Sequence, residues 1–155
     1  MSSTATPTPI DPRGPRFGAA ITSVVLAAVL VLGPGTPALI LLVVQTVAFA
    51  LGSLVGVSAQ PYGIVFRRLV RPRLAAPAEL EDPRPPRFAQ TVGLAFAVVG
   101  LAGLLLAPVL FYVAIGLALV AAFLNAAFDF CLGCELYLLG RRVAGRPLTP
   151  ATTEA

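Results

Sequence analysis

The sequence carries little charge and lacks several residues on which enzymes commonly depend. Of its 155 residues only 12% are charged, and it contains neither histidine nor tryptophan. All eleven basic residues are arginine, so lysine is absent as well. These absences exclude a catalytic histidine, a histidine metal cluster and a Schiff-base lysine. We therefore expect no cofactor and assign no metal site.

Most of what remains is apolar. Hydrophobic residues make up 57% of the chain and the mean hydropathy is +0.90, well above that of a soluble domain. A membrane-spanning helix needs roughly 20 apolar residues. Four apolar stretches are about that long, at residues 17–32, 38–57, 88–107 and 109–130; the first three are uncharged, and the fourth has one charged residue, Asp129, near its end. Because turn-forming residues divide them into two pairs, the sequence predicts an all-α membrane protein with four transmembrane helices in two hairpins.

A seven-residue motif occurs twice. Asp-Pro-Arg-Gly-Pro-Arg-Phe at residues 11–17 returns 71 residues later as Asp-Pro-Arg-Pro-Pro-Arg-Phe at 82–88. A hairpin and then an arginine-rich segment follow each copy. Since each unit crosses the membrane twice, both units enter it in the same direction, which predicts two tandem parallel repeats about an axis along the membrane normal.

The repeat also sets the expected domain organisation. The halves cover about residues 11–74 and 82–148, within a single membrane domain at 11–145. We expect the ends of the chain, 1–10 and 149–155, to be disordered tails.

The arginines indicate the orientation in the membrane. All eleven lie on one side of the four predicted helices, so the positive-inside rule places both termini and the long middle loop in the cytoplasm. The expected location is the inner (plasma) membrane. Residues 61–74, aromatic and basic, are typical of an interfacial amphipathic helix that binds anionic lipid. Beside a bilayer such a segment indicates membrane lipid as the partner, and we expect no nucleic acid binding.

The repeated motif has two interpretations. Its prolines predict a non-helical entry to each hairpin, where Asp can cap the helix or pair with Arg. As a membrane anchor, it would place Arg13, Arg16, Arg84 and Arg87 against lipid phosphates. Alternatively these four arginines bind a small anion, as in a carrier or transporter subunit for a sulfur oxyanion. Four helices are few for a transport path, so this alternative also requires a homodimer or a partner subunit.

Two amides lie inside predicted helices, Gln45 and Asn125. An amide without a partner is costly in a bilayer, so we expect both to face other helices. Hydrogen bonding between helices and lining of a substrate path both remain open.

The most informative segment contains both cysteines of the chain, Cys131 and Cys134. Their Cys-x-x-Cys spacing suits thiol-disulfide or sulfur chemistry, half of a soft-metal site, or two packing cysteines. Asp129 stands beside them at the membrane edge, where an acid is a functional candidate. A cytoplasmic position favours the reduced form, so a purely structural disulfide is not expected.

The reactivity of the cysteines depends on the helix around them. We expect a kink near residues 128–130, with Asp129 as N-cap of a new helix over 131–140. The helix dipole would then make Cys131 the more reactive thiol. The carboxylates of Asp129 and Glu135, both candidate site residues, would oppose a nearby thiolate.

The repeated motif at 82–88, the arginine-rich residues 67–74 and the Phe-Cys-x-Gly-Cys-x-x-Tyr segment at 130–137 together resemble a bacterial integral-membrane family, domain of unknown function 4395. The resemblance covers about residues 10–145, and the Arg, Gly and Ala bias resembles that of actinobacterial proteins. The family implies no established activity. Its association with thioredoxin-like and rhodanese-like proteins implies a soluble partner of that kind.

These observations favour one function over two others. The leading hypothesis is thiol-disulfide or sulfane-sulfur exchange between a cytoplasmic Cys131/Cys134 dithiol and a soluble thioredoxin-like or rhodanese-like protein. The alternatives are the sulfur-oxyanion carrier and a structural membrane subunit with no thiol chemistry. Whether the protein is an enzyme stays open at this point.

Overall fold

The structure, a computed structural model, describes residues 7–145, and within them all regular elements are helical. Arg146 and the predicted C-terminal tail lie outside the described residues. The helices are α1 (Arg13–Leu32), α2 (Thr36–Ala50), α3 (Pro61–Val65), α4 (Arg84–Leu106), α5 (Pro108–Phe128) and α6 (Leu132–Val143). A π-helix, η1 (Leu51–Val55), extends α2, while η2 (Phe66–Val70) and η3 (Arg71–Arg73) extend α3.

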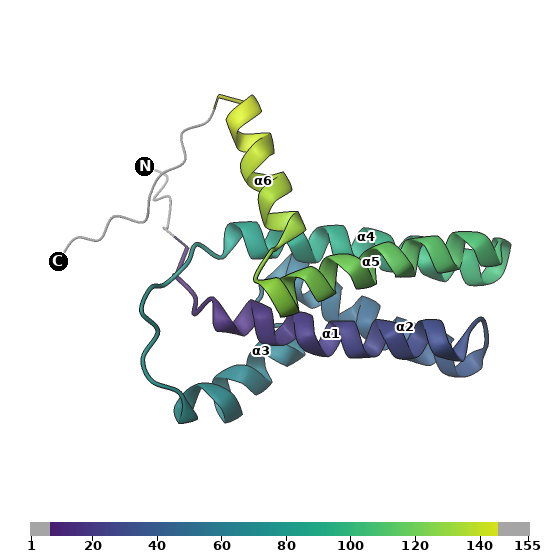
Figure 1. Cartoon of the computed structure of the whole chain (residues 1–155), viewed down its shortest axis with the longest axis horizontal. Helices are drawn as coiled ribbons and strands as arrows, with labels where there is room; N and C mark the ends of the chain where they lie inside the picture. Colours follow the sequence, from purple (N-terminus) through teal and green to yellow (C-terminus); the bar gives the residue numbers. More distant parts are fainter. Residues whose placement is uncertain (1–6, 146–155) are drawn as a thin grey trace.

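Four of these elements are long and apolar enough to cross a membrane: α1, α2 with η1, α4 and α5. They confirm the four predicted spans. In the bundle, α1 packs against α2 and α5, and α4 packs against α5 and α2. Figure 1 shows both hairpin turns at one end of the bundle, with α3 and α6 at the other. Large apolar side chains such as Val31, Leu105 and Leu106 are exposed on the outside, as expected for a surface that faces lipid.

The repeated motif is helical sooner than its prolines suggested. Helix α1 begins at Arg13 and α4 at Arg84, so Pro15, Pro85 and Pro86 lie in first turns. The expectation of a non-helical entry was wrong at these positions. In the first turn, proline has no hydrogen bond to lose and its fixed φ suits a helix.

The core of the bundle lies where the two hairpins meet. Leu26, Leu42, Phe111 and Ile115 are fully buried there. On α4, a Cβ at position 100 would collide with the Ile115 side chain. Glycine at this position therefore allows α4 and α5 to pack closely, as small residues do in membrane bundles.

Several contacts recur at the 71-residue spacing. The Phe17 and Phe66 rings lie 5.8 Å apart, and so do those of their counterparts Phe88 and Tyr137. An antiparallel β-bridge joins Ile10, at the end of the predicted N-terminal tail, to residue 81, which stands 71 positions later. These contacts are compatible with equivalent halves, and their relation by an axis along the membrane normal stays a prediction.

Candidate functional site

The chain changes direction between α5 and α6, which confirms the predicted kink. Helix α5 ends at Phe128, and α6 begins at Leu132. Asp129 has a left-handed backbone with φ of 57°. Its N–H bonds to the Asn125 carbonyl at 3.1 Å, and the next N–H, from Phe130, reaches the Leu124 carbonyl at 3.2 Å.

This geometry corrects the role predicted for Asp129. The hydrogen bond from Asp129 to the carbonyl four residues earlier is that of an αL helix ending, so Asp129 terminates α5 and is not the N-cap of α6. A residue held at positive φ lacks the extended backbone that an N-cap requires. Aspartate tolerates this conformation better than most residues with a side chain.

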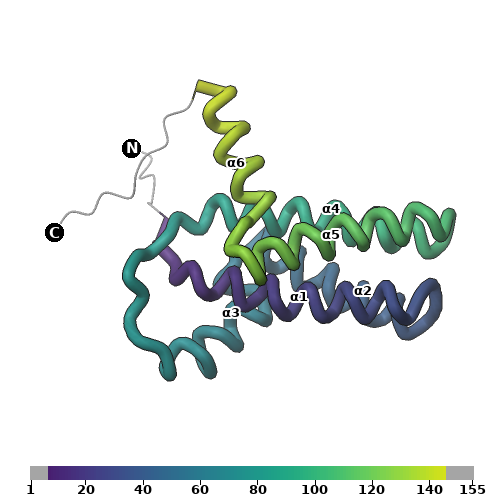
Figure 2. The backbone as a smooth tube through the Cα atoms, in the orientation of Figure 1, coloured from purple at the N-terminus to yellow at the C-terminus, as the bar shows by residue number. Residues whose placement is uncertain are grey.

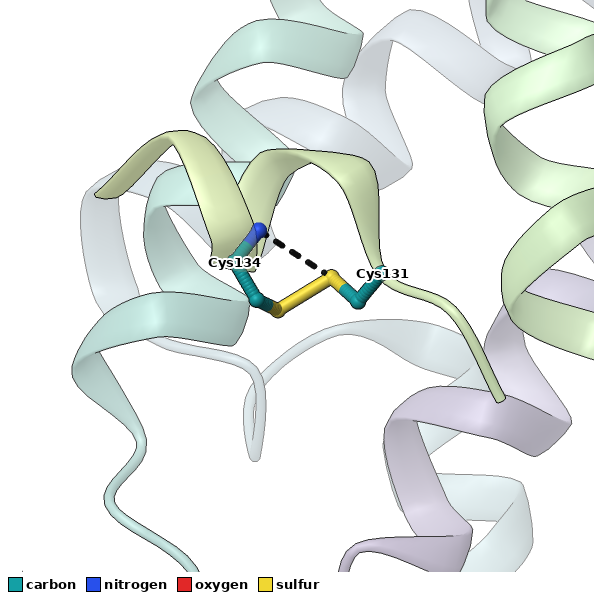
Figure 3. The surroundings of a disulfide bond; sticks show 2 residues. All are labelled: Cys131 and Cys134. Carbon is teal, nitrogen blue, oxygen red and sulfur yellow. Dashed lines mark hydrogen bonds between the residues drawn. A yellow bond between two sulfur atoms is a disulfide. The ribbon is translucent and has the colours of Figure 1, made fainter. Parts of the chain in front are cut away.

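The N-cap of α6 is Cys131 itself. Its backbone is extended, and its Sγ accepts a hydrogen bond from the Cys134 N–H at 3.3 Å. The two cysteines form a disulfide, with Cα atoms 5.2 Å apart (Figure 3). Both residues are half-buried, so the disulfide lies at the base of α6 within reach of the surface.

Helix α6 is held at its base and leaves the bundle at an angle, as the backbone path in Figure 2 shows. Gly133 is buried against α4, where an added Cβ would lie 2.6 Å from both Cα and Cβ of Ala89. One turn further along, Tyr137 packs on Phe88 of α4. These contacts fix the disulfide at the junction of α4, α5 and α6.

One acidic candidate precedes the two cysteines in the chain and the other follows them. Asp129 and Glu135 are both exposed, with Glu135 in the first turn of α6. The pKa of Glu81, in the linker before α4, is raised. Loss of solvation is the main cause, and repulsion from the charges of Asp129 and Glu79 adds to it. A patch of negative charge therefore lies between the linker before α4 and the end of α5.

The four arginines of the repeated motif all have partners within the chain. Arg13 pairs with Asp11 at 2.8 Å, and Arg84 pairs with Asp82. Each aspartate also accepts a hydrogen bond from the backbone N–H of its arginine. The hydrogen bonds from arginine are the largest influence on both aspartates, and they hold the pKa of each below its usual value.

The second arginine of each motif binds the other hairpin. Arg16 on α1 donates to the Ala126 carbonyl at the end of α5, at 3.1 Å. Arg87 on α4 donates to the carbonyls of Ser53 and Leu54, at the end of the helix formed by α2 and η1, at 2.6 and 2.7 Å. Both arginines lie at negative ends of helix dipoles, where a cation is stabilising.

A buried polar group fills the interior of the first hairpin. The Gln45 side chain is fully buried and donates to the Thr22 hydroxyl at 3.3 Å. It accepts from the Tyr62 hydroxyl at 2.8 Å, so Gln45 bonds between helices as expected. The involvement of Thr22 and Tyr62 was not predicted, because a single helical pattern does not show which helices meet.

Cys131 also lines a cavity of about 280 Å³ inside the bundle. Its lining is mostly apolar and comes from α1, α2, α4, α5 and α6. Asn125 lies on its wall, together with Gln90 and Thr22. The sequence did not predict this cavity, although the lining of a substrate path was one of the two interpretations of Asn125.

Fold and site together define an all-helical protein of the multi-pass membrane type with a Cys-x-x-Cys disulfide at one end of its bundle. Residues 10–142 match the family described as Domain of unknown function (DUF4395), and the chain belongs to that family. No curated protein and no solved structure shows a significant match to it.

Proposed function

We propose that this protein is a membrane thiol-disulfide exchange protein whose Cys131–Cys134 pair reacts with a soluble thioredoxin-like or rhodanese-like partner. The carrying observation is the capping role of Cys131: its sulfur receives the Cys134 N–H at the start of α6. When the disulfide is reduced, the same N–H and the helix dipole favour a thiolate on Cys131. That sulfur is therefore the better nucleophile of the pair.

The exchange needs no further reagent. A thiolate of the reduced partner attacks one sulfur of the disulfide and forms a mixed disulfide, and the partner's second thiol then releases the Cys131/Cys134 dithiol. Two electrons pass from the partner to this protein, and the partner leaves oxidised. The reverse sequence begins with the Cys131 thiolate.

The partner would approach the end of the bundle that carries α3 and α6. All the arginines of the described chain are at this end, beyond or at the edges of the apolar spans. By the positive-inside rule this end faces the cytoplasm of the cell, with the protein in the plasma membrane. A soluble cytosolic protein is then the natural partner.

The exchange is tested by trapping the mixed disulfide. With Cys134→Ala, Cys131 has no resolving thiol, so a complex with the partner should persist on a non-reducing gel and dissolve with reductant. Cys131→Ala should trap much less, and the double variant serves as the control. Capture of a thioredoxin-like protein by mass spectrometry would identify the partner class, whereas a gain of one sulfur atom on Cys131 would indicate sulfane-sulfur transfer.

A second measurement concerns Cys131 alone. In the Cys134→Ala variant, the alkylation rate of Cys131 should reach half its maximum at a pH below about 8.5, which is the ordinary pKa of a free thiol. If the rate follows an unperturbed thiol and no complex forms, the cysteines only pack, and the proposal is wrong.

We favour thiol-disulfide exchange over a sulfur-oxyanion carrier, because the four motif arginines suggested for the anion already bond to Asp11, Asp82 and backbone carbonyls.

A further inference from the structure

Near the cavity beside Cys131, the two halves of the chain carry different side chains at corresponding positions. In the first hairpin the interior is filled by three hydrogen-bonded side chains, those of Thr22, Gln45 and Tyr62. At the 71-residue spacing, the corresponding positions of the second hairpin are all glycine: Gly93, Gly116 and Gly133. Two of them, Gly93 and Gly133, line the cavity.

The same comparison relates the disulfide to the first hairpin. Gln60, the N-cap of α3, corresponds to Cys131, the N-cap of α6. The side chain of Gln60 is buried and bonds to Gln90. Its counterpart Cys131 instead borders open space. Cys131 therefore places a sulfur on the wall of this cavity, at the position where the first half carries a buried amide.

The position and lining of the cavity indicate a lipophilic ligand. It extends from Cys131, just outside α5, to Leu117, eleven residues before the end of that helix. At the rise of an α-helix this is about 16 Å, or half the thickness of a bilayer core. Its lining residue Leu117, within the span of α5, is about half exposed on the outside of the bundle. A molecule dissolved in the bilayer can therefore approach from the lipid side.

The polar groups on the wall indicate carbonyl groups in that ligand. The Oε1 atom of Gln90 accepts a hydrogen bond from Gln60 at 3.0 Å, which orients the Gln90 amide and leaves its NH2 group as a donor. Asn125 contributes a second amide to the same wall. Few polar groups in an apolar cavity serve to orient a ligand, and amide donors suit a carbonyl oxygen.

From these features we infer that the cavity binds a membrane-dissolved quinone, which oxidises the Cys131/Cys134 dithiol. The inference rests on the proposed thiol exchange and gives its electrons a destination. Two S–H bonds break and one S–S bond forms. The two electrons and two protons pass to the quinone, whose two carbonyl oxygens become the hydroxyls of a hydroquinone. The oxidised protein can then accept electrons from its soluble partner again.

The test uses the full chain in detergent, reduced and freed of reductant, with decylubiquinone as the probe. The ring of this quinone is fully substituted, so thiols do not simply add to it. We expect one disulfide, counted as loss of alkylatable thiol, for each hydroquinone formed. The Cys131→Ala variant should form neither.

Cavity-filling variants make the test specific. Ala122→Leu and Ala121→Leu enlarge side chains that line the cavity, and either should slow oxidation by decylubiquinone about tenfold. Ala127→Leu, on the exposed side of the same helix, is the matched control and should react as the wild type does. Size-exclusion elution and thermal unfolding of each variant show whether the bundle is intact. Two cavity-filling variants are used so that the test remains possible if one of them does not fold.

In a parallel experiment, each reduced variant is mixed with oxidised thioredoxin, a soluble disulfide protein whose reaction does not require the cavity. If this exchange is normal while decylubiquinone oxidises wild type no faster than Ala122→Leu and Ala121→Leu, the quinone inference is wrong and the proposed function stands. If both reactions fail in folded wild-type protein, the proposed function fails with it. Decylbenzene has the same alkyl chain but no carbonyls. If it protects Cys131 from alkylation as strongly as decylubiquinone does, the cavity binds acyl chains and the quinone inference is wrong.

Discussion

Gln45 shows how a single amide is accommodated inside the bundle. Its side chain is fully buried, with its NH2 group bonded to Thr22 and its carbonyl oxygen to Tyr62. Because Tyr62 belongs to α3, this hydrogen bond also fastens the short helix to the bundle. A polar group buried in this way costs free energy as soon as one partner is removed.

We predict that Tyr62→Phe lowers the free energy of unfolding by about 1 kcal/mol, because it leaves the Gln45 carbonyl oxygen unpaired. Thermal unfolding in detergent measures the change. Tyr112→Phe is the control, since that tyrosine is on α5 and partly exposed. Equal loss in both variants would mean that the hydrogen bond to Gln45 adds no stability.

The aspartates of the repeated motif make stability depend on acidity. Their pairing with arginine lowers the pKa of Asp11 and of Asp82, so the ionised forms stabilise the fold. This stabilisation is complete above the unfolded pKa of about 4 and is lost as the pH falls through the lowered folded pKa. The unfolding temperature should therefore drop on acidification below about pH 4, and Asp11→Asn should make the drop smaller.

Glu81 provides a control of opposite sign. Its pKa is raised, mainly by loss of solvation, so its protonated form is the one that the fold favours. Acidification through its range adds stability, and Glu81→Gln should remove that gain and steepen the net acid loss. If both variants shift the acid profile in the same direction, the charges at this end do not act as the contacts indicate.

At the scale of elements, the backbone of Asp129 sets the angle between α5 and α6. A β-branched residue at its positive φ is strained by about 1–2 kcal/mol, whereas glycine and asparagine adopt this conformation readily. We predict that Asp129→Val destabilises the protein by that amount, while Asp129→Gly and Asp129→Asn remain within about 0.5 kcal/mol of wild type. Thermal unfolding separates these outcomes, and an equal loss in all three would instead indicate a role for the carboxylate.

Sequence patterns predicted the helices better than their junctions. The apolar stretches predicted all four spans, because the thickness of the bilayer requires an apolar helix of about 20 residues. The kink was also predicted, but the capping residue was Cys131 and not Asp129. Which of two neighbouring polar residues caps a helix depends on backbone angles that the pattern does not contain.

The cavity illustrates a different limit. Its lining comes from five helices, and contacts between helices cannot be read from the periodicity of one helix. The repeat shows only that the halves differ in side-chain size: Thr22, Gln45 and Tyr62 all have glycine as their counterparts. These glycines differ from their counterparts because Gly93 and Gly133 are packed closely, against Phe49 and Ala89.

At the scale of the whole molecule, the two ends of the bundle differ in charge and should face different compartments. Gly35 lies in the turn of the first hairpin and Ala78 in the linker before α4, and both are exposed. In a background without Cys131 and Cys134, we expect an impermeant thiol reagent on intact cells to label Gly35→Cys and to spare Ala78→Cys. Labelling after permeabilisation is the control for reactivity, and the reverse pattern would invert the topology.

The bridge between Ile10 and Glu81 is compatible with duplication of a single hairpin unit. It joins a position to its own counterpart, which is the contact that two identical hairpins would make across the two-fold axis of a homodimer. When two such hairpins are joined in one chain, the contact is kept. The two halves can then change independently, because a substitution in one half no longer appears in the other. One half then has Tyr62, which bonds to the buried Gln45. The other half has Gly133 at the corresponding position, between the two cysteines of the disulfide.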